Sequence, residues 1–263
     1  MAIAVARLAP GRVERNPTQS VNTTMLGQIY TDEDRAIKAV IKSLSPRQLA
    51  NELIAAELVS ALNLPGPRGF LVFADPEDSF DPNACRHPNG YQMFFGSELS
   101  PFPTFYTFFN MQDSMALGAI LQCNEWGSVV GFDEWIANTD RHLNNFLYDG
   151  QTIYLFDHDR CLSGANWSPP DLEPSIAYPC HVVVDYIHQQ LVDSKKRQAA
   201  RLAGEIERRA SELDLDDILN KSYAREVNHG IPVDLPAAVE FLRLRIPHIA
   251  RLCAGRLSVG GLL

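Results

Sequence analysis

The stretch that decides the fold runs from residue 132 to residue 159 and reads FDEWIANTDRHLNNFLYDGQTIYLFDHD. It begins with apolar residues at helical spacing, which predicts the end of an amphipathic helix: Phe132, Trp135 and Ile136. Two short apolar runs, 146–148 and 152–156, flank the turn sequence Asp149-Gly150 and predict a hairpin. The expected order is therefore helix, polar loop, hairpin and an acidic segment, Asp157–Asp159, which we call the acidic tip. Because the hairpin reverses the chain, the polar loop and the acidic tip lie at the same end of the hairpin.

Two residues of the polar loop have a spacing typical of phosphoryl transfer. Asp140 and Asn145 match the D-x-x-x-x-N of a kinase catalytic loop, in which Asp accepts the proton of the substrate hydroxyl and Asn holds magnesium. Because the hairpin returns the chain to the same edge, Asp157 can face Asn145 across one metal ion. Magnesium prefers such oxygen ligands together with substrate phosphates. The alternative interpretation is that these residues only cap helices and form turns.

Composition limits the class of protein. With 263 residues, the chain can form one large domain or two lobes that share a cleft. Hydrophobic residues make up 46% and charged residues 21%, which indicates a globular protein with a substantial core. The net charge of -9 argues against binding to nucleic acid or anionic membranes, because neutralising phosphates needs a basic surface.

The cysteines and the apolar runs predict the compartment. The five cysteines form no C-x-x-C pair and their number is odd, which is typical of free thiols in a reducing cytoplasm. Residues 1–15 lack the sustained apolar segment of a signal peptide, and no run approaches the length of a membrane span. We therefore expect a cytoplasmic protein that does not enter the membrane.

A candidate phosphate-binding lysine lies in the N-terminal third. Residues 36–44 predict a strand, and its segment Ala39-Val40-Ile41-Lys42 resembles the V-A-I-K strand whose lysine reaches the nucleotide phosphates. Lys38 is expected to be a solvated edge residue instead. Ser45 and Gln48 then have the spacing of a capping box, so a helix is predicted to begin directly after the strand.

This predicted helix, which extends to about residue 62, is apolar around nearly its whole circumference and should be largely buried. Glu52 and Glu57 on it then need partners, since an unpaired buried carboxylate is costly. The two are about 140° apart around the helix and cannot share one partner. A strand lysine followed by a helix glutamate is typical of kinase small lobes. We favour Glu52 as the partner of Lys42; the alternative is that either glutamate pairs with an arginine elsewhere.

A predicted strand over residues 91–95 runs into Gly96-Ser97-Glu98. In a two-lobed kinase the hinge falls here, and backbone groups from Phe95 to Ser97 are expected to hydrogen-bond adenine. The alternative is an ordinary exit from a strand into a loop.

The chain beyond residue 97 predicts mostly helices, over 113–123, 125–137, 182–192, 195–213, 215–221 and 236–256. We therefore predict an α+β, protein-kinase-like fold with two lobes. Residues 1–96 would form a small lobe with an antiparallel sheet and one helix, and residues 97–263 a larger, mainly helical lobe.

The motifs resemble one kinase family. The block Asn138-Thr-Asp-Arg-His-Leu-Asn-Asn145 with the later Leu155-Phe-Asp157 is similar to the catalytic core of the HipA-like serine/threonine kinases. The similarity extends over roughly residues 10–160 and includes these further segments: Ile41-Lys42, Asn51-Glu52-Leu53, Leu62-Asn-Leu-Pro65 and Phe94-Phe-Gly-Ser-Glu98.

The resemblance implies roles for single residues. Asp140 would be the catalytic base and His142 would order its loop. Asn145 and Asp157 would hold Mg²⁺. Lys42 would contact the phosphates of ATP, and Glu52 would orient that lysine. It also implies a protein substrate with a Ser or Thr acceptor, and a regulatory partner such as the antitoxin of a toxin–antitoxin pair.

The sequence also departs from this family. Persistence toxins of this type carry an extra N-terminal domain, for which 263 residues leave little room. The loop expected to cover the phosphates, Ser20–Thr24, contains no glycine. Asp157-His158-Asp159 replaces a D-F-G, so Asp159 could share or take the metal role. Two other functions stay open: a small-molecule or phosphoinositide-type kinase, and a pseudokinase that binds nucleotide or a partner without turnover.

Overall fold

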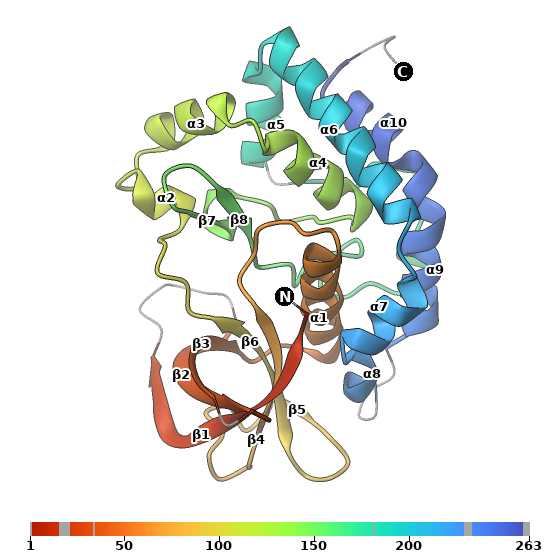
Figure 1. The fold of residues 1–263 in the computed structure, drawn as a ribbon. Coiled ribbons are helices and arrows are strands. Elements are labelled where there is room, and N and C mark those ends of the chain that lie inside the picture. The colour runs from red at the N-terminus through yellow and green to blue at the C-terminus, as the bar shows by residue number, and fades with distance from the viewer. Residues whose placement is uncertain (1, 16–21, 34, 181, 229–232, 260–263) are drawn as a thin grey trace.

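A computed structural model describes residues 2–15, 22–33, 35–180, 182–228 and 233–259. The loop expected over the phosphates, residues 20–24, lies partly outside the described residues. Six strands gather at one end of the molecule (Figure 1): β1 (Ala4–Arg15), β2 (Thr24–Thr31), β3 (Ala36–Lys42), β4 (Gly69–Ala74), β5 (Cys85–Arg86) and β6 (Gln92–Glu98). They form one sheet in the order β3-β2-β1-β4-β6-β5, and β3 also pairs with β6. This extra pairing closes five of the strands into a ring.

The expectation of a purely antiparallel sheet is wrong at one position. Strands β1 and β4 pair in parallel, from Ala4 beside Phe70 to Arg7 beside Phe73, whereas the other pairs are antiparallel. Helix α1 (Pro46–Ala61) lies between β3 and β4 in the chain and returns it so that β4 starts beside the start of β1.

The interior of the ring is filled by apolar side chains from every strand: Ala6, Leu8, Ile29, Ala39, Ile41, Phe70, Val72, Ala74 and Phe94. Gly96 faces this interior, because a Cβ there would lie 2.7 Å from Val72 Cγ2. Since successive residues of a strand face opposite sides, Ile41 points into the ring while Lys42 points out of it. The packing of the ring therefore aims Lys42 toward the rest of the protein.

Helix α1 confirms the predicted capping box. Ser45 Oγ accepts from the Gln48 backbone N–H at 3.4 Å, and Gln48 Oε1 accepts from the Ser45 N–H at 3.3 Å. The helix is buried over most of its length and packs against β4 on one side and against helices α7 (Leu215–Lys221) and α8 (Ala224–Val227) on the other (Figure 1). It is thus the element that joins the sheet to the helices.

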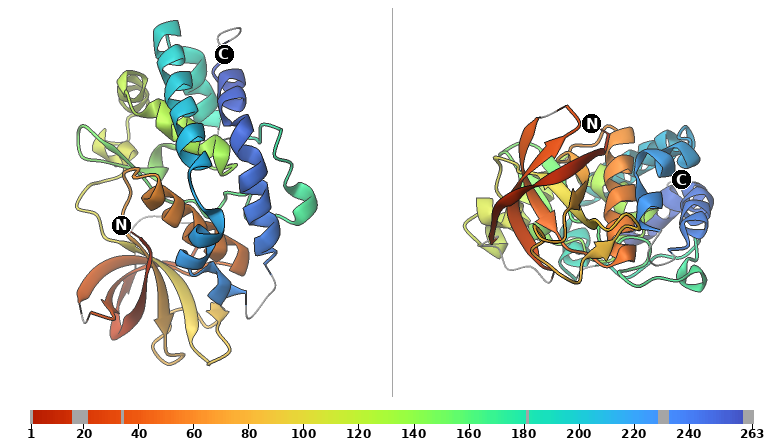
Figure 2. Two further views of the ribbon diagram at one scale, coloured as in Figure 1. Left: turned by 45° about the vertical axis from the view of Figure 1, so that its right-hand side comes forward. Right: turned by 90° about the horizontal axis from the view of Figure 1, so that it is seen from below.

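The rest of the chain is mostly helical, as predicted: α2 (Phe105–Phe108), α3 (Asp113–Gln122), α4 (Trp126–Trp135), α5 (Val182–Gln190), α6 (Asp193–Ser211), α7 (Leu215–Lys221), α8 (Ala224–Val227), α9 (Leu235–Arg245) and α10 (Ile249–Arg256). Helices α4, α6 and α10 pack side by side (Figures 1 and 2). The expected single helix over residues 236–256 is wrong: a 3₁₀ turn, Ile246–His248, separates α9 from α10, because Pro247 lacks the N–H that a continuous helix needs. No described helix is long and apolar enough to cross a membrane.

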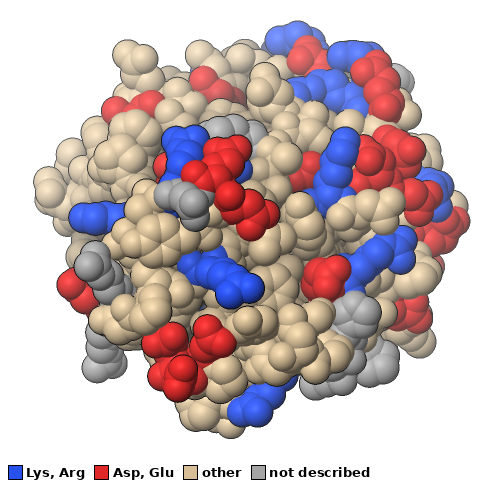
Figure 3. Space-filling model, turned by 60° about the horizontal axis from the view of Figure 1, so that its bottom comes forward, with Lys and Arg blue, Asp and Glu red and all other residues tan. Residues whose placement is uncertain are grey.

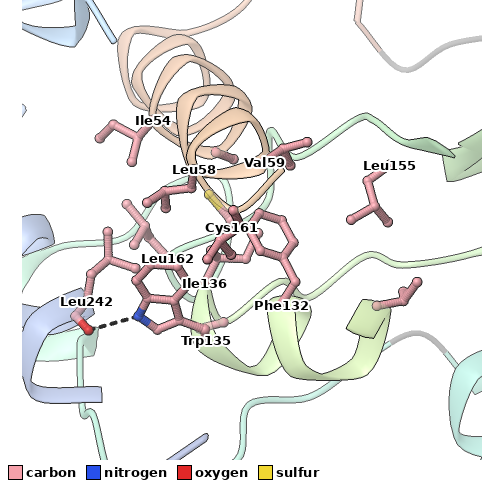
Figure 4. Close-up of a cluster of buried hydrophobic side chains, with 14 of the residues drawn as sticks. Ile54, Leu58, Val59, Phe132, Trp135, Ile136, Leu155, Cys161, Leu162 and Leu242 are labelled. Atoms are coloured by element: carbon pink, nitrogen blue, oxygen red, sulfur yellow. Dashed lines mark hydrogen bonds between the residues drawn. The ribbon is translucent and has the colours of Figure 1, made fainter. Parts of the chain in front are cut away.

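The predicted hairpin is present as β7 (Phe146–Tyr148) and β8 (Ile153–Leu155). Side chains from α1, from α4, from β8 and from the segment after β8 form one buried cluster (Figure 4). Trp135 lies at its edge and donates from Nε1 to the backbone oxygen of Leu242 at 3.0 Å. This cluster packs α4, which directly precedes the predicted catalytic loop, against α1.

Candidate active site

Lys42 lies between two carboxylates that come from distant parts of the chain. Its Nζ is 2.7 Å from Glu52 Oε1 and 2.7 Å from Asp157 Oδ1. Burial lowers the pKa of Lys42, but Asp157 and Glu52 raise it by more, so the ammonium stays charged. The structure therefore joins three of the sequence-predicted residues in one ionic cluster.

The two glutamates of α1 have different partners. Glu52 Oε2 accepts from the backbone N–H of His158 at 2.9 Å, so this carboxylate holds both Lys42 and the acidic tip. Burial raises the pKa of Glu52 to about 7 against the opposing pull of Lys42. Glu57, on another face of the helix, accepts from the backbone N–H of Ile3 at 2.9 Å. Glu57 thus anchors the start of the chain and takes no part in the cluster.

The candidate catalytic loop is ordered by its own side chains. Asn145 Nδ2 donates to the backbone oxygen of Asp140 at 2.7 Å, and Asn138 Oδ1 accepts from the Asp140 N–H at 3.2 Å. His142 caps the 3₁₀ turn Leu143–Asn145, its Nδ1 accepting from the Asn144 N–H at 3.2 Å. The Asp140 carboxylate is about 29% exposed and has Arg160 Nε 3.6 Å from its Oδ2. A substrate hydroxyl can therefore reach it.

Arg141 is a residue whose part the motif did not predict. It is fully buried and makes a two-pronged bond with Asp133 of α4, Nε to Oδ2 and Nη2 to Oδ1, each at 2.9 Å. Its Nη1 donates to the backbone oxygens of Asn145 at 2.7 Å and Phe156 at 2.9 Å. Arg141 therefore connects the loop to the open end of the hairpin, where the chain leaves β8. The available signal was a pair of charged residues, Asp133 and Glu134, on a helix that is otherwise mostly apolar.

The acidic tip has an unusual backbone. Asp157 has a φ of 62°, in the left-handed region. Burial opposes the charge of Asp157, but Lys42 outweighs burial and lowers the pKa of this carboxyl. Asp159 Oδ2 accepts from Asn22 Nδ2 at 2.6 Å and from Gln48 Nε2 at 2.8 Å, while burial and Asp157 raise the pKa of Asp159. Asn22 lies in the loop expected over the phosphates, but its bond to Asp159 was not predicted, and Gln48 was predicted only as part of the capping box.

A cavity of about 270 Å³ adjoins Lys42 and Asp157. Its lining is mainly apolar and comes from the sheet, from the segment between β6 and α2, and from the hairpin: Leu26, Val40, Phe102, Leu147 and Leu155. Phe95 and Ser97 also line it. The candidates Asp140, His142 and Asn145 do not line this cavity. Arg141 donates to the backbone oxygens of both Asn145 and Phe156, and so connects their loop to the residue before Asp157.

One predicted detail at the hinge does not fit. Strand β6 lies between β3 and β4, so the backbone of Phe95 to Ser97 pairs within the sheet on both sides. These backbone groups are not available to adenine. The next residues that line the cavity are Glu98, Leu99 and Ser100. The N–H groups of Glu98 and Leu99 already donate to the backbone oxygens of Arg68 and Lys38, each at 2.9 Å. Backbone contacts from this segment to a base would therefore have to use its carbonyl oxygens or the Ser100 N–H.

The side-chain oxygens of Asn145 and Asp157 are suitable ligands for a magnesium ion that also binds phosphates. Asn145 uses its Nδ2 in the loop, and among the described residues no group donates to its Oδ1, which leaves an oxygen ligand available. Asp157 accepts from Lys42 through Oδ1, and its other carboxylate oxygen, Oδ2, is a further possible metal ligand. No cluster of three or more His, Cys, Asp or Glu side chains able to hold a metal occurs within the described ranges. Two protein ligands with substrate oxygens are what Mg²⁺ commonly takes.

The comparisons with known proteins place the chain in a family of kinases. The model of the HipA-like kinase family matches residues 25–213, and the chain belongs to this family. A search of curated proteins finds no match. The chain is similar to the solved structure of the Helicobacter pylori proinflammatory kinase CtkA, with 16% identity, a TM-score of 0.51 and coverage of 95% of this chain and 98% of that one. A MAP kinase from Leishmania major, LmaMPK10, matches with 14% identity and a TM-score of 0.34 over 93% of this chain and 78% of that one.

Proposed function

We propose that this protein transfers the γ-phosphoryl group of ATP, with Mg²⁺, to a serine or threonine hydroxyl of another protein. The observation that carries the proposal is the cluster in which Lys42 bridges Glu52 and Asp157 at the inner end of an apolar cavity. A kinase needs a lysine held at the phosphates and an aspartate at the metal, both in place at once.

ATP would enter with its base in the cavity. Leu26 and Val40 from the sheet would cover one side of adenine, and Leu147 and Leu155 from the hairpin the other. The triphosphate would then extend toward Lys42 and Asp157. In this view the sheet with α1, residues 1–96, and the helical part, residues 97–263, act as two lobes that enclose the nucleotide.

Asn145 and Asp157 would hold Mg²⁺, with Asp159 as a further carboxylate near them. When bound, the ion neutralises charge on the β- and γ-phosphates. Lys42 would hold phosphate oxygens in position, and Glu52 would keep Lys42 aimed at them. Since phosphoryl transfer needs little covalent help from the protein, this positioning would supply most of the rate enhancement.

Asp140 would receive the proton of the acceptor hydroxyl. The acceptor oxygen then forms a bond to the γ-phosphorus, the bond from that phosphorus to the β–γ bridging oxygen breaks, and ADP leaves. The exposure of Asp140 supports this role, because the acceptor must approach from solvent. His142 and Arg141 would keep the loop in the required shape.

Labelled ATP separates this proposal from its alternatives. The protein is incubated with γ-labelled ATP and Mg²⁺, alone and with cell lysate, beside Asp140→Asn as a matched control. Label in protein, on Ser or Thr after hydrolysis, and absent with Asp140→Asn, supports the proposal. Label in small molecules or lipids would assign a small-molecule or phosphoinositide-type kinase. ATP that binds but is never transferred would assign a pseudokinase.

The proposal extends to the compartment, to the class of substrate and to a regulatory partner. The five cysteines are free thiols, which supports a reducing compartment such as the cytoplasm. On the face in Figure 3, basic side chains are interspersed with acidic ones, which supports a protein substrate over nucleic acid. A regulatory, antitoxin-like partner would be tested by copurification of the protein from its native cell.

A further inference from the structure

Asn51 has no role in the function proposed above, yet its side chain makes four hydrogen bonds to one distant segment of the chain. It lies on α1 directly before Glu52 and is fully buried. Its Nδ2 is 2.9 Å from the backbone oxygen of Asp159, 2.9 Å from that of Cys161 and 3.3 Å from that of Gly164. Its Oδ1 accepts from Trp167 Nε1 at 2.9 Å. A single amide thus binds four points of the segment that follows the hairpin.

Two neighbours on the same helix bind the same segment. Gln48 donates to Asp159 Oδ2, and Glu52 accepts from the His158 N–H. Positions three or four residues apart on a helix lie on one face. Three polar side chains of α1, with Asn51 at the centre, therefore fasten the segment 157–167 to the helix that also positions Lys42.

This segment has a backbone that needs such support. Asp157, Leu162 and Ser163 have φ values of 62°, 55° and 71°, which non-glycine residues rarely adopt. Such a conformation is strained and persists only where the surroundings determine it. The bonds from Asn51 fall between and beyond these three residues. They are therefore placed to hold the conformation that aims Asp157 at Lys42.

We propose that Asn51 is a positioning residue for the metal–nucleotide site. It contacts neither nucleotide nor acceptor, and it acts by holding residues 159–167 on α1 so that the Asp157 carboxylate stays at the phosphates. The proposal rests on the proposed function in so far as Asp157 serves the Mg²⁺–ATP complex. Outer partners of metal ligands typically change metal affinity by about 10- to 100-fold when mutated.

The test uses Asn51→Asp, which keeps the shape and the acceptor for Trp167 but replaces the donor by an oxygen that faces three carbonyls. ATP is titrated calorimetrically with and without Mg²⁺. We expect the Mg²⁺-dependent gain in ATP affinity to fall by about tenfold or more, with metal-free ATP affinity within about threefold of wild type. Hydrogen exchange should become faster in residues 157–167.

Glu57→Gln is the matched control, because Glu57 is a buried carboxylate on the same helix that binds the Ile3 backbone instead. It should lower the thermal midpoint but leave the Mg²⁺ effect and exchange in 157–167 unchanged. If Asn51→Asp does not fold, Trp167→Phe removes only one of the four bonds and should give a smaller change in the same direction.

The inference is overturned if folded Asn51→Asp, or Trp167→Phe, keeps the wild-type Mg²⁺ effect and the wild-type exchange in 157–167. Failure of the proposed function is seen elsewhere, in the wild-type protein, as ATP that is not bound or not transferred. In that case the exchange measurement alone decides whether Asn51 holds the segment.

Discussion

The Nζ of Lys42 and Oδ1 of Asp157 lie 2.7 Å apart although 115 positions separate the two residues in the chain. The contact joins strand β3 to the end of the hairpin, and Glu52 of α1 completes it. Lys42 and Glu52 are buried, whereas the Asp157 side chain is about 31% exposed, so the lysine and the glutamate depend most on this contact for their charges. The contact therefore links the sheet, α1 and the acidic tip at the point where phosphates would bind.

Lys42→Met should remove most phosphoryl transfer, because the phosphates lose their cation and the two carboxylates lose theirs. We expect a loss of about 10² to 10³ in kcat, as for removal of one charge-stabilising donor. Lys38→Met is the control, since Lys38 lies on the same strand and is exposed. A labelled-ATP assay on both variants measures the difference. Equal activity of the two would exclude the role assigned to Lys42.

Asp140→Asn should separate chemistry from binding. Loss of a general base typically lowers the rate by about 10² to 10⁴. Since the Asp140 side chain is partly exposed and does not line the cavity proposed for the nucleotide, the affinity for ATP with Mg²⁺ should stay within a few-fold of wild type. Calorimetry and the transfer assay check both numbers. Full activity of this variant would show that the base lies elsewhere.

Asp157→Asn and Asp159→Asn compare the two carboxylates of the tip. Asp157 contacts Lys42, whereas Asp159 is held by Asn22 and Gln48. We therefore expect Asp157→Asn to weaken both Mg²⁺-dependent ATP binding and turnover strongly, and Asp159→Asn to have the milder effect. ATP titrations with and without Mg²⁺ rank the two. The reverse order would assign the metal to Asp159.

Asp133→Ala should destabilise the fold, because it leaves the fully buried guanidinium of Arg141 without its carboxylate. Breaking a buried pair by removing one partner costs about 3–5 kcal/mol of unfolding free energy. The exposed pair Arg201–Glu205 is the control, and Glu205→Ala should cost less than about 1 kcal/mol. Urea unfolding of both variants gives the two values. A small loss in Asp133→Ala would mean that water or the backbone compensates Arg141.

The same substitution should have opposite effects at two helix glycines. Gly127 of α4 packs on α6, where a Cβ would lie 2.5 Å from Ala199 Cα, so Gly127→Ala should lower stability by about 1–3 kcal/mol. Gly204 of α6 has nothing within 4 Å of that position, so Gly204→Ala should raise stability by about 0.5–1 kcal/mol. Denaturation curves test the signs. A stabilising Gly127→Ala would show that α4 and α6 can move apart.

Features that depend on neighbouring residues were predictable from the sequence. The capping box at Ser45 and Gln48 satisfies backbone groups within one turn, and the turn at Asp149-Gly150 sets the hairpin register. The break at Pro247 was also predictable, because a proline outweighs apolar periodicity within a helix. The spacing of Asp140 and Asn145 similarly indicated a kinase catalytic loop, because that motif lies within six consecutive residues.

The sequence alone determined most of the helices, the hairpin and the residue types of the candidate site, because these follow from periodicity, caps and short spacings. Only the tertiary structure decided that β1 pairs in parallel with β4, that Lys42 takes Glu52 and not Glu57, and that Asn51 holds the acidic tip. These outcomes depend on which surfaces meet when the chain packs. Two glutamates on one buried helix satisfy the same local rules, and the packing of α1 against the sheet and the tip chooses between them.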